Sequence, residues 1–165
     1  MDGSIDTQSP VIQVPDGGEP VWFTSNRIVI KVRGAETGGA FGLIEATAPP
    51  GASPPLHVHS REEESFWVLE GEVEFLCGEE RFRAGPGGFA LLPRGIPHSF
   101  LVVGDAPARF INVITPGGME DFFARAGRPA EGPGLPPAGP PDIEALARAG
   151  EEFEIATIGP PMSPA

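Results

Sequence analysis

Residues 51–71 read GASPPLHVHSREEESFWVLEG, and this stretch decides how the rest of the chain is interpreted. Its segment 65–69 is aromatic and β-branched and is followed by the turn signal Glu70-Gly71, which favours a β-strand that ends in a turn. Two histidines, His57 and His59, stand two positions apart just before it. Side chains at positions i and i+2 of a strand point to the same face, so these two imidazoles can bind one ion.

A carboxylate and the third histidine of the chain extend this pair. After a turn at 60–62, the next strand can bring Glu64 to the side of His57 and His59. His98 follows PRGIP at 93–97, a stiff turn that would fix the direction of its strand. Three imidazoles and one carboxylate suit a divalent transition metal, and an octahedral ion would keep two positions open. The alternative is that the His-x-His pair lies on the surface or in the core without binding metal.

Two further carboxylates, Glu62 and Glu63, lie in the same turn and are rival ligands. We interpret both as a solvated acidic turn, because runs of charge in turns usually face water. The single cysteine, Cys77, cannot form an intrachain disulfide and is interpreted as a small core residue.

Outward from this stretch, the chain from about 21 to 115 shows short strand patterns punctuated by Gly and Pro. Many short strands with close turn signals favour a sandwich or a barrel. No internal repeat is visible. The expected strands are 21–24, 27–33, 40–47, 56–59, 64–70, 72–77, 80–83, 88–92, 98–103 and 108–114.

The C-terminal part has a different character. A short helix is predicted at 119–126 and a second at 142–149, ending at Gly127 and Gly150 respectively. Between them, 10 of the 15 residues in 127–141 are Gly or Pro, which indicates an extended linker. Residues 153–158 form a further strand or extended packing segment.

On these residues the chain resembles the cupin superfamily. The spacing Gly51-x5-His57-x-His59-x4-Glu64-x6-Gly71 resembles the first cupin motif, and Gly87-x5-Pro93-x-Gly95-x2-His98 resembles the second. The second motif usually continues with an asparagine, where this chain has Val102. The resemblance implies an all-β fold, a cupin jelly-roll β-barrel with short C-terminal helices. It also implies the metal ligands His57, His59, Glu64 and His98.

The resemblance divides the chain into an N-terminal extension (1–20), the barrel (21–116), and C-terminal helices with a Pro/Gly-rich strap (117–165). The flanks GEPVWF at 18–23 and PPLHVH at 54–59 resemble bacterial single-domain quercetin 2,3-dioxygenase-like cupins. This implies a metal-dependent oxygenase that acts on a small organic substrate of the flavonol or enol kind, with O₂ as co-substrate. It also implies a homodimer formed through sheet edges, the alternative being a monomer whose N-terminal segment covers an edge.

Strand alternation around the metal ligands predicts a mainly apolar cavity that suits a small aromatic or organic ligand. Each phenylalanine in it can instead be plain barrel core, and the helix at 119–126 either caps a barrel opening or simply docks on the barrel. The candidate pocket residues are Leu43, Glu45, Phe66, Val68, Phe100, Asn112, Phe122 and Phe123.

The proposed catalytic residue is Glu64, a ligand that can also accept a proton from a substrate hydroxyl. One alternative is a cupin metalloenzyme that performs isomerisation or decarboxylation without O₂, and another is a non-catalytic small-molecule-binding cupin. The ligand set does not distinguish Fe, Ni, Mn, Co, Cu or Zn.

Composition excludes some classes of partner. The chain has 23 Asp and Glu against 11 Lys and Arg, a net charge of −12. It therefore lacks the basic surface that nucleic acids and anionic membranes require. The start, MDGSIDTQS, has neither the basic nor the apolar region of a signal peptide, and we expect a cytoplasmic protein.

Overall fold

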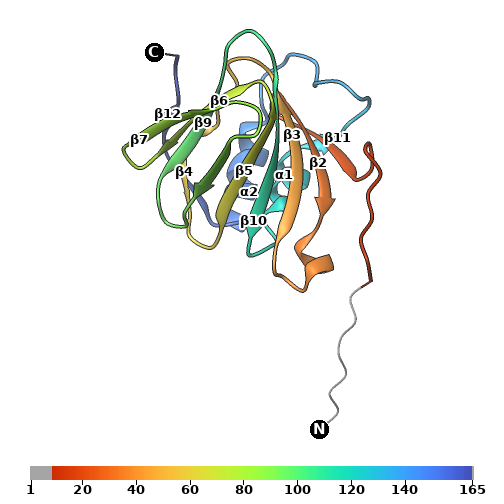
Figure 1. Ribbon diagram of the computed structural model, residues 1–165. Helices are drawn as coiled ribbons and strands as arrows, with labels where there is room; N and C mark the ends of the chain where they lie inside the picture. Colours follow the sequence, from red (N-terminus) through yellow and green to blue (C-terminus); the bar gives the residue numbers. More distant parts are fainter. Residues whose placement is uncertain (1–8, 165) are drawn as a thin grey trace.

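The computed structural model describes residues 9–164, which form a barrel of two antiparallel sheets (Figure 1). The larger sheet has the strand order β11-β1-β2-β3-β10-β5-β8, and the smaller has the order β12-β4-β9-β6-β7. This confirms the expected all-β jelly roll with short C-terminal helices. The strands are β1 (Glu19–Phe23), β2 (Asn26–Val32), β3 (Gly42–Ala48), β4 (Pro55–His59), β5 (Glu63–Glu70), β6 (Glu72–Cys77), β7 (Glu80–Ala84), β8 (Phe89–Leu92), β9 (His98–Val103), β10 (Ala108–Thr115), β11 (Arg128–Pro129) and β12 (Ile155–Pro161).

Each barrel strand expected from the sequence is present, with its ends within two residues of the expected ones. The helices are η1 (Gly34–Thr37), α1 (Glu120–Ala126) and α2 (Ile143–Glu152). The prediction that the second helix ends at Gly150 is wrong. The helical hydrogen bonds continue past Gly150 to Phe153, whose N–H donates a hydrogen bond to the carbonyl of Ala149. A glycine inside a helix costs only about 1 kcal/mol, which the neighbouring turns can offset.

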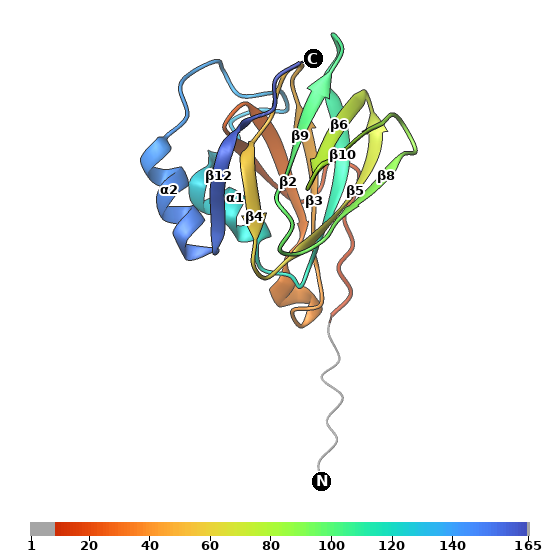
Figure 2. The same ribbon diagram turned by 90° about the vertical axis from the view of Figure 1, so that its left-hand side faces the viewer.

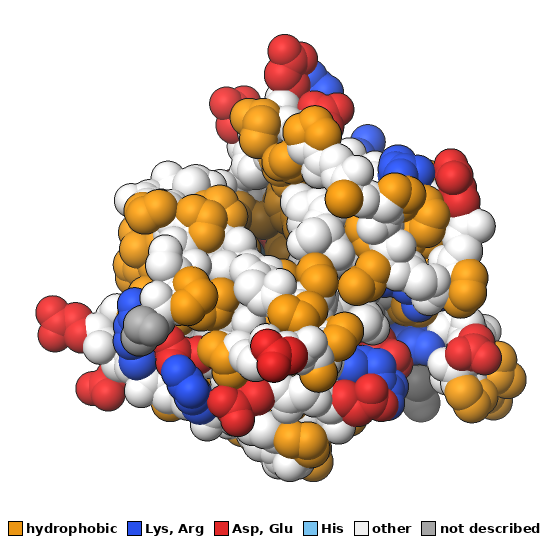
Figure 3. Space-filling view, turned by 90° about the horizontal axis from the view of Figure 1, so that it is seen from above, with side chains coloured by type: hydrophobic (Ala, Val, Ile, Leu, Met, Phe, Trp, Pro, Cys, Tyr) orange, Lys and Arg blue, Asp and Glu red, His pale blue; other side chains and the backbone are white. Residues whose placement is uncertain are grey.

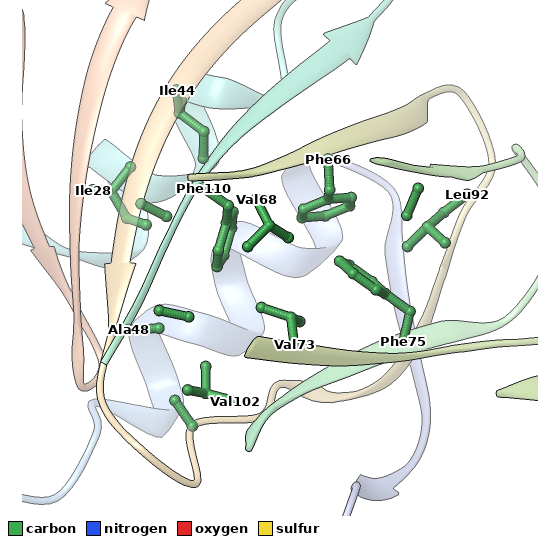
Figure 4. Packing of buried hydrophobic residues seen from close by; sticks show 14 of the residues in the cluster. Ile28, Ile44, Ala48, Phe66, Val68, Val73, Phe75, Leu92, Val102 and Phe110 are labelled. Carbon is green, nitrogen blue, oxygen red and sulfur yellow. The ribbon is translucent and has the colours of Figure 1, made fainter. Parts of the chain in front are cut away.

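The core lies between the two sheets (Figure 4). Aromatic rings occupy its centre: Phe66 of β5 lies 5.3 Å from Phe75 of β6 and 5.6 Å from Phe110 of β10, measured between ring centroids. Smaller side chains, including Val73 and Val102, continue the packing along the barrel. The alternation of each strand supplies these residues, because every second side chain faces the opposite sheet.

Both C-terminal helices lie against one side of the barrel, next to β12 and β4 in Figure 2. Phe123 of α1 packs edge-on against Phe23 of β1 with a centroid distance of 5.1 Å. The segment predicted as an extended linker lies against the same side: β11 pairs with β1, and Trp22 Nε1 donates a hydrogen bond to the carbonyl of Gly134 at 2.9 Å. Among the described helices, none has the length and apolarity needed to cross a membrane.

Candidate metal centre

The three histidines and Glu64 come from three strands that meet inside the barrel. His57 of β4 lies directly opposite His98 of β9 in the antiparallel register, and His59 follows on the same face of β4. Glu64 stands near the start of β5, where the alternation that buries Phe66 also turns the carboxylate inward. One ligand atom from each of the four side chains lies within 4.8 Å of the others. The structure thus brings together all four metal ligands expected from the sequence.

Two of the imidazoles are oriented by backbone carbonyls. His57 Nδ1 lies 2.7 Å from the carbonyl of Pro55, and His98 Nδ1 lies 3.0 Å from that of Ile96. A carbonyl can only accept a hydrogen bond, so each Nδ1 carries the proton and each Nε2 is directed to the cluster. Nε2 of His98 lies 2.9 Å from Glu64 Oε2.

Burial and mutual charge set the protonation of these groups. Burial, followed by the charge of His98, lowers the pKa of His57 to about 4, so this imidazole is neutral at neutral pH. Burial alone would raise the pKa of Glu64, but contacts with His59 and His98 outweigh it and hold the pKa well below its usual value. A neutral imidazole and an ionised carboxylate are the forms that bind metal.

His59 provides the test of whether a metal fits. Its side chain is 2% exposed, and neither ring nitrogen has a hydrogen-bond partner among residues 9–164. Nε2 is 3.1 Å from Glu64 Oε2, within ion-pair distance but without hydrogen-bond geometry. An unsatisfied buried polar group costs about 1–3 kcal/mol, and a cation between these two atoms would satisfy both. The set of three nitrogens and one oxygen therefore fits a divalent transition metal.

Asn112 of β10 fixes the other oxygen of Glu64. Its Nδ2 donates a hydrogen bond to Glu64 Oε1 at 2.6 Å, and the side chain is buried. Glu64 therefore keeps Oε2 toward the imidazoles while Oε1 is held by the neighbouring strand. Within the described part of the chain, Asn112 Oδ1 has no partner of its own. Asn112 was expected as a pocket residue, and the structure places it beside the cluster of three histidines and Glu64.

The other expected pocket residues divide into inner and outer groups. Phe66 and Val68 face the barrel interior and are buried, and Phe100 packs half-buried against Phe110 at a centroid distance of 5.4 Å. Seen from above, the end of the barrel at which β9 ends is hollowed and lined by apolar side chains (Figure 3), whereas His98, at the start of β9, lies at the other end. Phe122 and Phe123 of α1 pack against Phe23, as expected of a helix that docks on the barrel.

The expectation that Leu43 and Glu45 line the pocket is wrong. On β3 the inward positions are held by Ile44 and Ala46, so their neighbours face outward. Glu45 instead accepts a hydrogen bond from Arg109 Nη1 at 3.1 Å on the outer face of the sheet. Both faces of this strand carry apolar or small side chains, so its sequence pattern does not show which face is buried.

The interpretation of Glu62 as a solvated carboxylate is also wrong. Its side chain is 2% exposed and lies beside His59, whereas Glu63 is partly exposed. Glu62 and Glu63 look alike in the sequence, and only the path of the chain separates them: Glu62 lies in the turn between β4 and β5, and Glu63 is the first residue of β5. Burial alone would lower the pKa of His59, but the contact with Glu64 and the charges of Glu64 and Glu62 raise it.

Comparisons with known proteins agree with this geometry. A family model described as "Cupin domain" matches residues 44–114, which include all four clustered side chains. The quercetin 2,3-dioxygenase of Bacillus subtilis is 28% identical over 120 residues, covering 73% of this chain and 35% of that protein. The quercetin 2,3-dioxygenase of Aspergillus japonicus is 31% identical over 101 residues, covering 56% of this chain and 28% of that protein. The matched regions thus span about a third of these curated relatives.

A solved structure, described as a "predicted oxalate decarboxylase" from Thermotoga maritima, shares the fold. It superposes with a TM-score of 0.58 at 21% identity, covering 64% of this chain and 98% of that chain. Because its identity is low, this likeness concerns the barrel alone. Residues 44–114 match the cupin domain family, the two-sheet barrel and the two motifs agree with this match, and the chain is similar to the quercetin 2,3-dioxygenases.

Proposed function

We propose that this protein is a metal-dependent oxygenase that acts on a small enol or flavonol-like substrate. The observation that carries the proposal is the cluster of three imidazoles and one carboxylate, of which all but His57 are buried and whose ligand atoms lie within 4.8 Å of one another. Four protein ligands leave room for substrate on an octahedral ion, unlike a closed structural site. The similarity to two quercetin 2,3-dioxygenases supports the reaction class.

The roles of the residues follow from their geometry. His57, His59 and His98 would hold the ion through Nε2. When bound, the ion would stabilise a substrate oxygen as an anion. Glu64 would accept the proton of the substrate hydroxyl at Oε2, while Asn112 keeps Oε1 in place. Apolar rings near the cluster would exclude water and favour a flat aromatic ligand.

Oxygen consumption tests this proposal. We expect the metal-stripped protein to consume no O₂, and protein reloaded separately with Fe, Ni, Mn, Co, Cu or Zn to consume O₂ with a flavonol or another enol in at least one metal form. The measurement is oxygen uptake with product analysis, and substrate with free metal serves as the control. Turnover without O₂ would instead identify an isomerase or decarboxylase. Ligand binding without turnover in any metal form would identify a binding module.

We further propose that the protein is a homodimer that buries the outer face of β5 and β8. This face carries Trp67, Phe89 and Leu91, which are 54%, 59% and 49% exposed. Trp67 and Phe89 are register partners, and β8 is the last strand of its sheet as described. Half-exposed residues of this size leave on the order of 100 Å² each, and together they form an apolar patch beside the edge of the sheet.

A second copy is the occupant that fits this patch. Beside the apolar residues, Arg109 pairs with Glu45 and Glu70 on the same face, so charges of both signs border the patch. In a dimer with a two-fold axis, the charges of one copy would face the opposite charges of the other copy. The terminal strand β8 has a free edge, along which β8 of the second copy could pair and continue the sheet.

We expect light scattering to give twice the 17.3 kDa chain mass for the wild-type protein and a monomer for Trp67→Glu. A charge placed at the centre of an apolar interface would be buried without a partner. The control is Ile143→Glu, a substitution at an exposed position of α2 that should leave the dimer intact. A monomeric wild-type protein, or a dimer that tolerates Trp67→Glu, would contradict the proposed interface.

A further inference from the structure

We propose that Glu62 is a positioning residue of the metal centre, which orients His59 through Nδ1 and raises its affinity for the ion. The inference rests on the proposed metal site but does not depend on the reaction performed there. Glu62 is not one of the four clustered side chains, and its carboxylate faces Nδ1 of His59.

An asymmetry among the three histidines leads to this assignment. His57 and His98 each have Nδ1 bonded to the carbonyl two residues earlier, at 2.7 and 3.0 Å. His59 has no such carbonyl: among the residues described, its Nδ1 has no hydrogen-bond partner. The group that faces Nδ1 is Glu62, whose Oε2 lies 3.9 Å away. The carboxylate therefore stands where the other two imidazoles have a carbonyl.

The burial of Glu62 needs an explanation that the fold alone does not supply. Its side chain is 2% exposed, and Oε2 has no hydrogen-bond partner in the described structure. Its other oxygen lies 3.8 Å from Arg61 Nε, an ion pair without a short contact. Burying a carboxylate with so few partners is unfavourable, because the group loses its hydration. Such a group persists in a native structure mainly where it has a specific role.

Only a small movement of Glu62 toward His59 is needed to form a hydrogen bond between them. The turn that carries Glu62 joins β4 to β5, and the carbonyl of His59 accepts a hydrogen bond from Gly95 N at 2.9 Å, which holds the strand end in place. A shift of about 1 Å would bring Nδ1 and Oε2 to hydrogen-bond distance. The bond would keep the proton on Nδ1 and the lone pair of Nε2 toward the ion. A carboxylate behind a metal-binding imidazole also makes it a stronger ligand.

The test is the affinity for Zn²⁺, measured by chelator competition, which needs no turnover. We expect about 10-fold weaker binding in Glu62→Gln, whose amide oxygen can still accept from Nδ1, and about 100-fold weaker binding in Glu62→Ala. The matched control is Glu63→Gln, which changes the same charge one residue along and should bind Zn²⁺ as the wild type does. Equal affinity in all four proteins would overturn the inference.

Two further measurements separate positioning from a merely structural role. The imidazole ¹⁵N spectrum of the Zn²⁺-loaded protein should show His59 protonated at Nδ1, and that proton should exchange faster with water in Glu62→Ala. In a His59→Ala background, Glu62→Gln should cause no additional loss of Zn²⁺ affinity. An equal loss with and without His59 would overturn the inference.

Wild-type protein that binds no Zn²⁺ or other transition metal would overturn both the metal site and this inference. Binding that is unaffected by Glu62 would overturn this inference alone.

Folding of the variants is checked by thermal unfolding without metal. Glu62→Gln removes a poorly paired buried charge, so its metal-free melting temperature should equal or exceed that of the wild type. If Glu62→Ala fails to fold, the Zn²⁺ affinity of the isosteric variant Glu62→Gln tests the proposal. A lower metal-free melting temperature of Glu62→Gln with unchanged Zn²⁺ affinity would make Glu62 structural and would overturn the proposal.

Discussion

The variant His59→Ala is expected to bind divalent transition metals more than about 100-fold more weakly than the wild-type protein, a larger loss than removal of a supporting residue causes. His59 is buried, its Nε2 lies 3.1 Å from Glu64 Oε2, and the cluster of possible ligands among residues 9–164 has only four members. The remaining ligands would be two imidazoles and one carboxylate. Metal content after dialysis, measured by elemental analysis, and Zn²⁺ affinity would show the effect.

Val58→Ala is the control for this variant. Val58 is the next residue of β4 and faces away from the cluster, so its truncation tests damage to the strand without removing a ligand. It should bind metal like the wild type. Addition of metal should raise the melting temperature of the wild type and Val58→Ala but not that of His59→Ala, because only a bound ligand stabilises the folded state. Full metal occupancy in His59→Ala would contradict the assigned ligand set.

The second large effect is expected for Glu64→Gln, which should retain metal but lose about 10²–10⁴-fold in kcat, the usual contribution of a general base. The amide oxygen can still face the ion, but the amide cannot take up the proton of a substrate hydroxyl. Contacts with His59 and His98 hold the pKa of Glu64 well below its usual value, so the carboxylate is ionised in the folded protein and has a lone pair free for a proton. Oxygen uptake at saturating substrate, together with metal content, measures both effects.

The surroundings of Glu64 can accommodate this substitution. Asn112 now donates to Glu64 Oε1 at 2.6 Å, and its own Oδ1 has no partner among the residues described. The amide of Asn112 can turn over and accept a hydrogen bond from the new amide instead. Glu63→Gln is again the matched control and should keep full turnover. Retained metal with unchanged kcat in Glu64→Gln would rule out the role of Glu64 as base and leave it as a ligand only.

The positions of the barrel strands along the chain could be predicted because they depend on local signals. Gly and Pro at the turns and β-branched or aromatic residues between them placed β1 to β10 within two residues of their observed ends, whereas the short strand β11 was not predicted. The second helix shows the limit of such signals, because Gly150 lies inside α2 and not at its end. A glycine inside a helix costs about 1 kcal/mol, and this cost was too small to end the helix, because its hydrogen bonds continue past Gly150.

Which face of β3 points inward could not be predicted from the sequence either. The residues from Leu43 to Ala46 include apolar or small side chains on both faces, so the pattern itself does not select the inner one. The pairing of β3 between β2 and β10 decides it, and this pairing places Glu45 beside Arg109 on the outside. A shift of one residue would have reversed this outcome, because successive side chains of a strand point to opposite faces.

By itself, the sequence determined which side chains could form a metal site: three histidines and a glutamate at spacings that place them on inward faces of neighbouring strands. The tertiary structure decided which groups support them. It buried Glu62 behind His59, set Asn112 against Glu64 and left Glu63 partly exposed. Ligand spacing is local and follows from strand geometry, whereas a supporting contact depends on where a turn and a distant strand lie in space. Adjacent glutamates therefore acquire different roles only after the chain folds.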